Sequence, residues 1–426
     1  MSIAQAELPS LSHAVFLQRA AQALPLPGGG LQSRLGQGAF LALRLIDLLG
    51  AEREAVHPDA FRYQCAATER FCRDLRVTST EGAHLQALVE SASGAQREGD
   101  VSRLLPGLFA YAYFLQYELR LEEALDVLRT LHSVGGERLS AADAVVLALR
   151  TGRVNRELSR FDDAEESYAE AGRRAALNGD HHSELLSRIG RANTDLGRGN
   201  LPLAEASLRR ILEDARATRD QEAEARAEHE IGVVMYHAGQ PAEAIPHVWR
   251  AFELYGDEDR RLRALNDAGV MLLMLGDPVG AERALLQVVR GGGSQDNVSN
   301  ALIELMHCAS YRRDHVTFAR WRARCEEKKG DMPPNILADY HLKTGIGQAR
   351  FGRFRQAVAS LTRALKIAES AGIHEFVFKI ERIKIGLHAC EQAVVAASPG
   401  DVEPVIQSDA LRAVSASLAQ LAAEHA

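Results

Sequence analysis

The chain has 426 residues, of which 46% are hydrophobic, 6% are aromatic and 25% are charged, and its formal net charge is −7. This hydrophobic content is enough to bury a core, so the composition excludes a chain that is disordered throughout. The negative balance does not favour binding to nucleic-acid backbones, which reward clustered Lys and Arg. The five cysteines are scattered and form no Cys-x-x-Cys pair, which argues against a thiolate zinc site.

The N-terminal residues 1–7 lack the basic segment and the long apolar run of a secretory signal. The longest apolar runs, such as residues 268–275, are much shorter than a membrane-spanning helix. We therefore expect a cytoplasmic protein without a membrane segment, in which the cysteines stay reduced.

Four helices are predicted in residues 1–99, near residues 11–24, 31–50, 58–75 and 81–96. Five glycines between residues 28 and 38 raise the possibility of a phosphate-binding loop. No Lys and no preceding strand accompany them, so we expect an interhelical loop instead. We interpret residues 1–99 as a divergent cap or as one or two eroded repeats.

From residue 100 onward one pattern recurs: a small residue in a first helix, a turn, and an alanine that opens a second helix. The positions of the second-helix residue are 37 to 40 apart: Ala124, Ala164, Ala204, Ala244, Ala281, Phe318 in place of an alanine, and Ala357. A period of this size is typical of stacked helix-turn-helix units, an α-solenoid.

Residues 226–255 are the clearest unit. Apolar residues recur at helical spacing around Gly232, and Gly239 with Pro241 marks the end of one helix and the start of the next. A small residue in each helix lets the two helices approach closely, and larger apolar residues fill the remaining space. One unit cannot bury its apolar face alone, so several units must stack.

This arrangement resembles the tetratricopeptide repeat over roughly residues 105–372. The family places a small residue in the middle of its first helix, and the matching positions here are Gly152, Gly232, Gly269 and Gly345. The family's aromatic positions in that helix are occupied by Asn155, Asp195, Met235, Leu272 and Gln348. The unit at residues 299–328 is degenerate. The resemblance implies an all-α fold, a right-handed α-solenoid of about seven helix pairs, and the period near 40 implies longer helices, as in members that enclose peptides.

After the last unit we predict a long helix over residues 373–395, a linker over residues 398–407 and a final helix. Four apolar residues fall on one face of the final helix: Leu411, Val414, Leu418 and Leu421. We therefore divide the chain into residues 1–99, a solenoid at 100–396, and a linker with a C-terminal helix at 397–426. That helix is a possible contact for homo-oligomer formation.

Polar side chains recur on the face of the first helices that lines the groove of such a solenoid: Arg150, Arg153, Asn193, Arg226, His229, Tyr236, Asn266 and His307. In the tetratricopeptide family, asparagine and basic residues on this face hold peptide backbones and carboxylates. Regularly spaced donors suit an extended or anionic ligand, whereas a merely hydrated surface is the alternative.

Other motifs favour structural roles. The histidines at positions 181, 182, 229 and 237 lack the His-Glu-x-x-His spacing of zinc enzymes, so we expect no metal site. Within residues 312–328, the spacing of Phe318, Trp321 and Cys325 indicates a core stripe flanked by solvated arginines rather than a nucleic-acid patch. No catalytic triad or paired carboxylates can be singled out, so we expect neither an enzyme nor a cofactor.

The sequence therefore predicts a non-enzymatic scaffold or adaptor that binds a protein or peptide in its groove, with no nucleic-acid or membrane partner. The alternative is a regulatory sensor module that binds a peptide or small effector inside the superhelix. In that form the chain resembles the peptide-sensing bacterial regulators with long tetratricopeptide units. Residues 1–75 contain no convincing DNA-binding helix-turn-helix.

Overall fold

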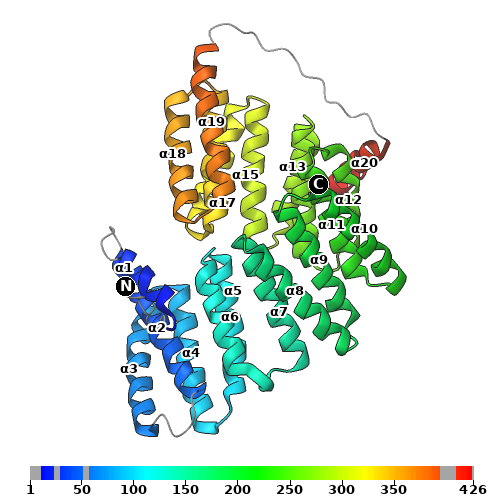
Figure 1. Ribbon diagram of the computed structural model, residues 1–426. Helices are drawn as coiled ribbons and strands as arrows, with labels where there is room; N and C mark the ends of the chain where they lie inside the picture. Colours follow the sequence, from blue (N-terminus) through cyan, green and yellow to red (C-terminus); the bar gives the residue numbers. More distant parts are fainter. Residues whose placement is uncertain (1–10, 24–28, 51–56, 394–408, 425–426) are drawn as a thin grey trace, which may run out of the picture. The chain divides into compact units, whose positions relative to one another are not determined.

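The computed structural model describes residues 11–23, 29–50, 57–393 and 409–424. Within these residues it contains twenty α-helices and three short 3-10 helices, and no strand (Figure 1). Sequential helices pack as antiparallel pairs, which confirms the predicted all-α, tetratricopeptide-like solenoid. The contacts divide the chain into two compact units, residues 1–184 and 185–426, which are described separately below.

The first unit opens with four helices that lack the repeat signature: α1 (Ala14–Ala23), α2 (Gly29–Gly50), α3 (Pro58–Arg76) and α4 (Thr80–Glu98). Two helix pairs follow, α5 (Leu105–Tyr117) with α6 (Leu121–Gly135), and α7 (Ala141–Glu157) with α8 (Phe161–Leu177). The 3-10 helices η1 (Val101–Leu104) and η2 (Gly136–Arg138) precede α5 and α7. In each pair we call the first helix the A-helix and the second the B-helix.

The helix predicted near residues 31–50 is confirmed as α2, but the interpretation of the glycines at 28–38 as an interhelical loop is wrong, because α2 already begins at Gly29. Gly28 lies outside the described residues. The physical reason is visible at Gly36, where an added Cβ would stand 2.6 Å from the carbonyl oxygen of Phe16 on α1. Glycine here lets two helices approach closely rather than breaking one of them.

A buried carboxylate ties the N-terminal helices to the first repeat. Glu81 on α4 accepts hydrogen bonds from Arg120 at 2.6 Å, from Arg19 on α1 at 3.1 Å and from the Tyr111 hydroxyl of α5 at 2.9 Å. Burial by itself raises the pKa of Glu81, but the two arginines outweigh it and hold that pKa at about 2. Helices α1 and α4 are therefore anchored to the first repeat by a charged cluster as well as by apolar packing.

The second unit continues the pairing. Its pairs are α9 (His181–Gly197) with α10 (Leu201–Thr218), α11 (Gln221–His237) with α12 (Pro241–Leu254), α13 (Glu258–Met274) with α14 (Pro278–Gly291), α15 (Gln295–Tyr311) with α16 (His315–Lys328), and α17 (Pro334–Arg350) with α18 (Phe354–Ser370). The 3-10 helix η3 (Lys329–Asp331) precedes α17, and the unit boundary falls in the first turn of α9. With the two pairs of the first unit, the described residues contain the seven pairs that the repeat predicted.

The predicted contact between small residues is present. An added Cβ on Gly232 of α11 would lie 2.5 Å from Cγ2 of Val248 and 3.1 Å from the carbonyl oxygen of Ala244, both on α12. Because there is no room for even a methyl group, the glycine permits the close packing of this pair. The same relationship recurs at Gly152, Gly269 and Gly345, which face Tyr168, Leu285 and Leu361.

Two further helices follow the repeats, α19 (His374–Ala393) and α20 (Asp409–Glu424), where a long helix and a final helix were predicted. Helix α20 packs on α12 and α14, with Leu411, Val414 and Leu418 buried and Leu421 partly buried. Its predicted apolar stripe is thus covered within the chain. The predicted linker at residues 398–407 lies outside the described residues, and the predicted division at residues 99 and 396 stays a prediction.

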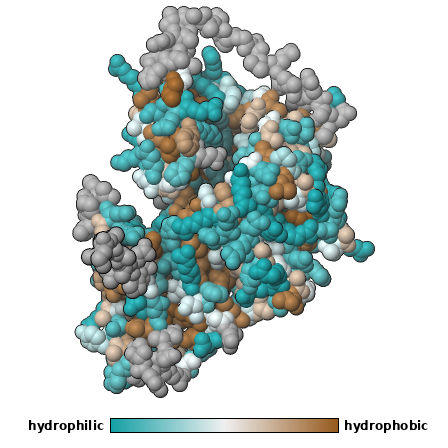
Figure 2. All heavy atoms as spheres, in the orientation of Figure 1, coloured by the Kyte–Doolittle hydropathy of each residue, from teal (hydrophilic) through white to brown (hydrophobic). Residues whose placement is uncertain are grey.

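The core stripe predicted in α16 is confirmed, since Phe318, Trp321 and Cys325 are all buried. The guanidinium groups of Arg320 and Arg324 lie over the Trp321 ring. On the face drawn in Figure 2, hydrophilic residues cover most of the visible surface and hydrophobic residues gather in smaller patches. No described helix combines the length and hydropathy that crossing a bilayer requires.

Candidate ligand-binding site

Helix α5 is apolar on nearly every side. Its sequence, LPGLFAYAYFLQY, carries a buried face that includes Leu108, Tyr111 and Leu115. Four other side chains of the helix are aromatic and partly open to solvent: Phe109, Tyr113, Phe114 and Tyr117. A helix that is apolar all round is normally buried on all sides. Exposed aromatic side chains are common at binding surfaces, so the aromatic side of α5 is the candidate site.

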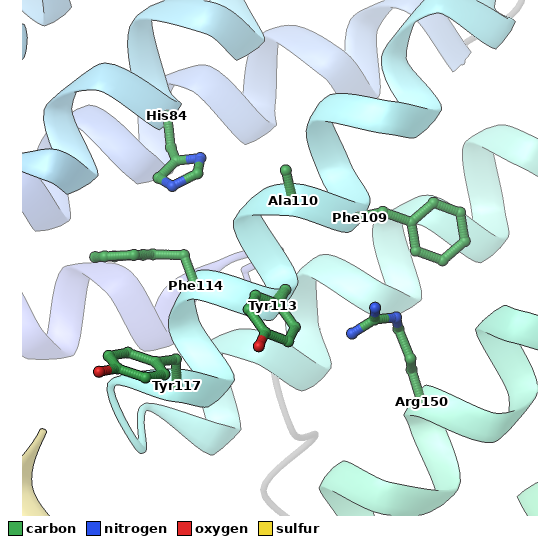
Figure 3. Close-up of a pocket in the computed structure, with 7 residues that line it drawn as sticks. All are labelled: His84, Phe109, Ala110, Tyr113, Phe114, Tyr117 and Arg150. Atoms are coloured by element: carbon green, nitrogen blue, oxygen red, sulfur yellow. The ribbon is translucent and has the colours of Figure 1, made fainter. Parts of the chain in front are cut away.

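These aromatic side chains line a pocket of about 590 Å³ on the A-helix side of the first unit. Figure 3 shows Phe109 and Arg150 at one end, Phe114 and Tyr117 at the other, and Tyr113 between them. Ala110 leaves space in the wall, and His84 of α4 completes the lining. Tyr113 is 56% exposed, although it stands in a predominantly apolar surface.

Arg150 supplies the positive charge of this pocket, which we call the aromatic pocket. Its guanidinium carbon lies 5.2 Å from the centre of the Tyr113 ring, a cation–π arrangement. Burial, followed by the charge of Arg153, lowers the pKa of Arg150, but an arginine keeps its charge at neutral pH. No carboxylate among the described residues forms an ion pair with Arg150, so its charge is available to an anionic ligand.

His84 contributes an uncharged polar edge. Its ring centre lies 5.0 Å from that of Phe114. Burial lowers the pKa of His84, against a smaller opposing effect of Glu81, so the ring is neutral at pH 7. A neutral imidazole offers one donor and one acceptor, which suits a peptide group better than a second charge.

Arg153 lies on the same helix as Arg150 but has a different partner. Its Nε donates to the Glu157 carboxylate at 2.9 Å, and Gln116 donates to the other oxygen of Glu157 at 2.8 Å. Of the two arginines predicted in this repeat, Arg150 lines the aromatic pocket and Arg153 is held in an ion pair beside it.

The other predicted residues lie in the second unit, and two of them are buried. His229 is 7% exposed, with Nδ1 at 3.2 Å from the Tyr255 hydroxyl and Nε2 at 2.9 Å from the Asp267 carboxylate. Asn266 is 8% exposed, and its Oδ1 has no hydrogen-bond partner in the described part of the chain. Both nitrogens of His229 are thus used between helices, and the roles of the two residues in binding stay predictions.

The remaining predicted residues are partly exposed. Arg226 donates to Glu222 at 2.8 Å, while Asn193 and Tyr236 are half-buried on α9 and α11. His307 packs edge-on against Tyr311, with ring centres 5.1 Å apart. Burial, then the charges of Lys343 and Arg350, hold the pKa of His307 well below its usual range, so it is neutral at pH 7.

Two groups of residues were not singled out from the sequence. One is the aromatic side of α5, whose signal was the run of aromatic residues between positions 109 and 117. The other is Lys343 of α17, whose Nζ donates to Asp339 at 2.6 Å and to Glu304 of α15. Among the described residues, no group of three or more His, Cys, Asp or Glu side chains is arranged to hold a metal.

Comparison with protein-family models and with curated proteins finds no match. Several solved structures are similar to this chain. A Rap protein complexed with competence and sporulation factor has 11% identity and a TM-score of 0.49, over 79% of this chain and 99% of that chain. NprR in complex with its cognate peptide NprX has 14% identity and a TM-score of 0.47, over 77% of this chain and 98% of that chain. Aspartyl phosphate phosphatase F from Bacillus subtilis has 13% identity and a TM-score of 0.45, over 80% of this chain and 94% of that chain. The repeated helix pairs, each packed through a small residue of the A-helix, make this chain a tetratricopeptide-like helical repeat protein.

Proposed function

We propose that this chain is a non-catalytic regulatory protein that binds a peptide, or an extended segment of a protein, on its A-helix side, with the aromatic pocket as the anchoring site. The exposed aromatic side of α5 carries this proposal, because an apolar helix surface that is open to solvent is typical of binding sites. Tyrosine and phenylalanine offer large contact areas at low cost in side-chain entropy.

The chemistry of the aromatic pocket supports a particular class of ligand. A volume of about 590 Å³ holds one or two large side chains rather than a folded domain. Arg150 has no ion-pair partner among the described residues, which favours a carboxylate beside those side chains. We therefore propose a segment that places an aromatic or branched apolar residue next to Asp, Glu or a free C-terminus.

A panning experiment with a random linear peptide library tests this proposal. The selected peptides are then titrated against the wild type, Tyr113→Ala and Arg150→Gln. We expect each substitution to weaken binding roughly ten- to hundredfold, since each removes a central contact. Tyr63→Ala and Arg97→Gln remove an exposed tyrosine and an exposed arginine of the same unit and are the matched controls.

Two results would overturn the proposal. One is a set of selected peptides without an apolar residue near a carboxylate. The other is wild-type affinity in both pocket variants while their melting curves are unchanged. If only a large folded partner binds, with contacts spread over many repeats, the scaffold function is favoured over the regulatory one.

A further inference from the structure

We propose a second ligand site in the first unit, between α6, α7 and α8, that binds a small amphipathic anion such as a medium-chain carboxylate. It is a pocket of about 690 Å³ on a different face of α7 from Arg150, and we call it the wedge pocket. The wedge pocket shares no lining residue with the aromatic pocket. The volume falls within the roughly 300–1,000 Å³ that is usual for small-molecule sites.

The wedge pocket lies beside a five-residue connection between two helix pairs. Residues 136–140 join α6 to α7, whereas two or three residues join α8 to α9 and α10 to α11. Gly136 adopts φ 43° and ψ −127°, a conformation that only glycine takes easily. At Gly135 an added Cβ would stand 2.7 Å from Cγ of Leu139. The longer connection therefore packs Leu139 onto the end of α6, and Leu139 forms one wall of the pocket.

The floor of the wedge pocket is apolar. Leu128 of α6 and Leu147 of α7 are nearly fully buried beneath it, and Ala144 and Ala148 leave the space above them open. The Thr151 hydroxyl donates its only proton to the Leu147 carbonyl at 2.9 Å, so this proton is not available to a ligand. Such a floor favours a hydrocarbon body, whose burial is worth about 0.8 kcal/mol for each methylene group.

The rim of the wedge pocket gives the sign of the ligand's charge. Arg129 and His132 are three positions apart, hence neighbours on one face of α6, and neither has an ion-pair partner among the described residues. On the α8 side, the Glu170 carboxylate is neutralised by Arg173 and by Arg174 at 2.5 and 2.6 Å, and Glu166 is the remaining acid. An anionic head group therefore fits at the α6 side, away from Glu166.

The test uses the full chain and two probes of equal length, decanoate and decylammonium, titrated calorimetrically below their micelle concentrations. We expect decanoate to bind saturably at one site and at least tenfold more tightly than decylammonium. Ala148→Phe fills the pocket and should weaken decanoate binding tenfold or more. Val146→Phe adds the same bulk to an exposed position of α7 outside the lining and should bind decanoate like the wild type.

A double variant, Arg129→Gln with His132→Gln, removes the guanidinium and imidazole groups of the rim without touching the apolar floor. It should remove the preference for decanoate over decylammonium, and because both side chains are exposed its melting temperature should be unchanged. Equal binding of the two probes to the wild type would overturn the proposal. So would loss of decanoate binding in Tyr113→Ala but not in the double variant, since that result places the anion in the aromatic pocket.

Discussion

Nδ1 of His13 lies 2.5 Å from a carboxylate oxygen of Asp126, 113 positions away in the sequence. Its Nε2 lies 3.1 Å from Asp47 of α2. His13 stands just before α1 and is 5% exposed, so one imidazole joins the start of α1 to two other helices. Burial by itself lowers the pKa of His13, but the hydrogen bonds and charges of the two aspartates outweigh it and raise that pKa to about 9.

This geometry predicts that the first unit loses stability as the pH rises. The folded pKa of about 9 exceeds the ordinary value of 6.5, so the contribution of His13 is complete below pH 6.5 and is lost as the pH rises through 9. Its size is of the order of 3 kcal/mol, from about 1.4 kcal/mol for each pKa unit. Urea unfolding between pH 6 and 10 measures the effect.

His13→Gln is the control for this prediction, because other groups also titrate in the same range. The glutamine cannot become charged, so the difference in unfolding free energy between the two proteins should shrink steadily from pH 6.5 to 9. A difference that is constant across that range would show that His13 does not gain its stabilising charge in the folded state.

A second prediction concerns the close packing of the helix pairs. Ala357 of α18 is fully buried, and its carbonyl oxygen lies 3.1 Å from the position that a Cβ on Gly345 would take. Ala357→Leu should therefore cost about 1–3 kcal/mol of unfolding free energy. Ala359→Leu, at an exposed position of the same helix, should change stability by less than about 0.5 kcal/mol. Equal thermal shifts in the two variants would contradict this repeat register.

A third prediction concerns the docking of α20. Leu418 is fully buried against the second unit, whereas Ala419 is exposed. Leu418→Glu removes roughly 1.5–3 kcal/mol of apolar burial and puts a charge in its place, so α20 should detach. Trypsin cleavage after Arg412 should then become much faster, while Ala419→Glu is cleaved like the wild type.

The same pair of variants tests the predicted homo-oligomer. If α20 joins two copies of the chain, sedimentation at high protein concentration should show an oligomer in the wild type and in Ala419→Glu, and a monomer in Leu418→Glu. One unchanging species in all three proteins would exclude α20 as that contact.

A fourth prediction links the two proposed pockets, because both are lined by α7. Arg150 enters the aromatic pocket, and Leu147, Ala148 and Thr151 line the wedge pocket. A ligand that wedges α7 from α6 should shift Arg150 relative to Tyr113. We expect saturating decanoate to weaken peptide binding by about fivefold or more, and peptide to weaken decanoate binding by the same factor, as linkage requires. Peptide titrations with and without decanoate measure this, and independent affinities would show that α7 does not couple the sites.

Much of the fold could be predicted because its contacts are local. Gly232 meets Val248, only one helix and one turn further along the chain, so the pair that must be small and large recurs at a fixed short spacing. The same locality explains the failure at residues 29–38, where the glycines were assigned to a loop. Glycine is required there by contacts between helices, such as that of Gly36 on α2 with Phe16 on α1.

The sequence by itself determined the helix pairs, their small-residue contacts and the face of each A-helix on which polar residues recur, because all of these follow from helical periodicity and from neighbours within one repeat. Only the tertiary structure decided which of those residues are accessible. His229 is enclosed because Tyr255, which follows α12, and Asp267 of α13 contact it, while Arg150 stays open beside Tyr113. Burial depends on contacts between separate helices, and no spacing along one helix contains that information.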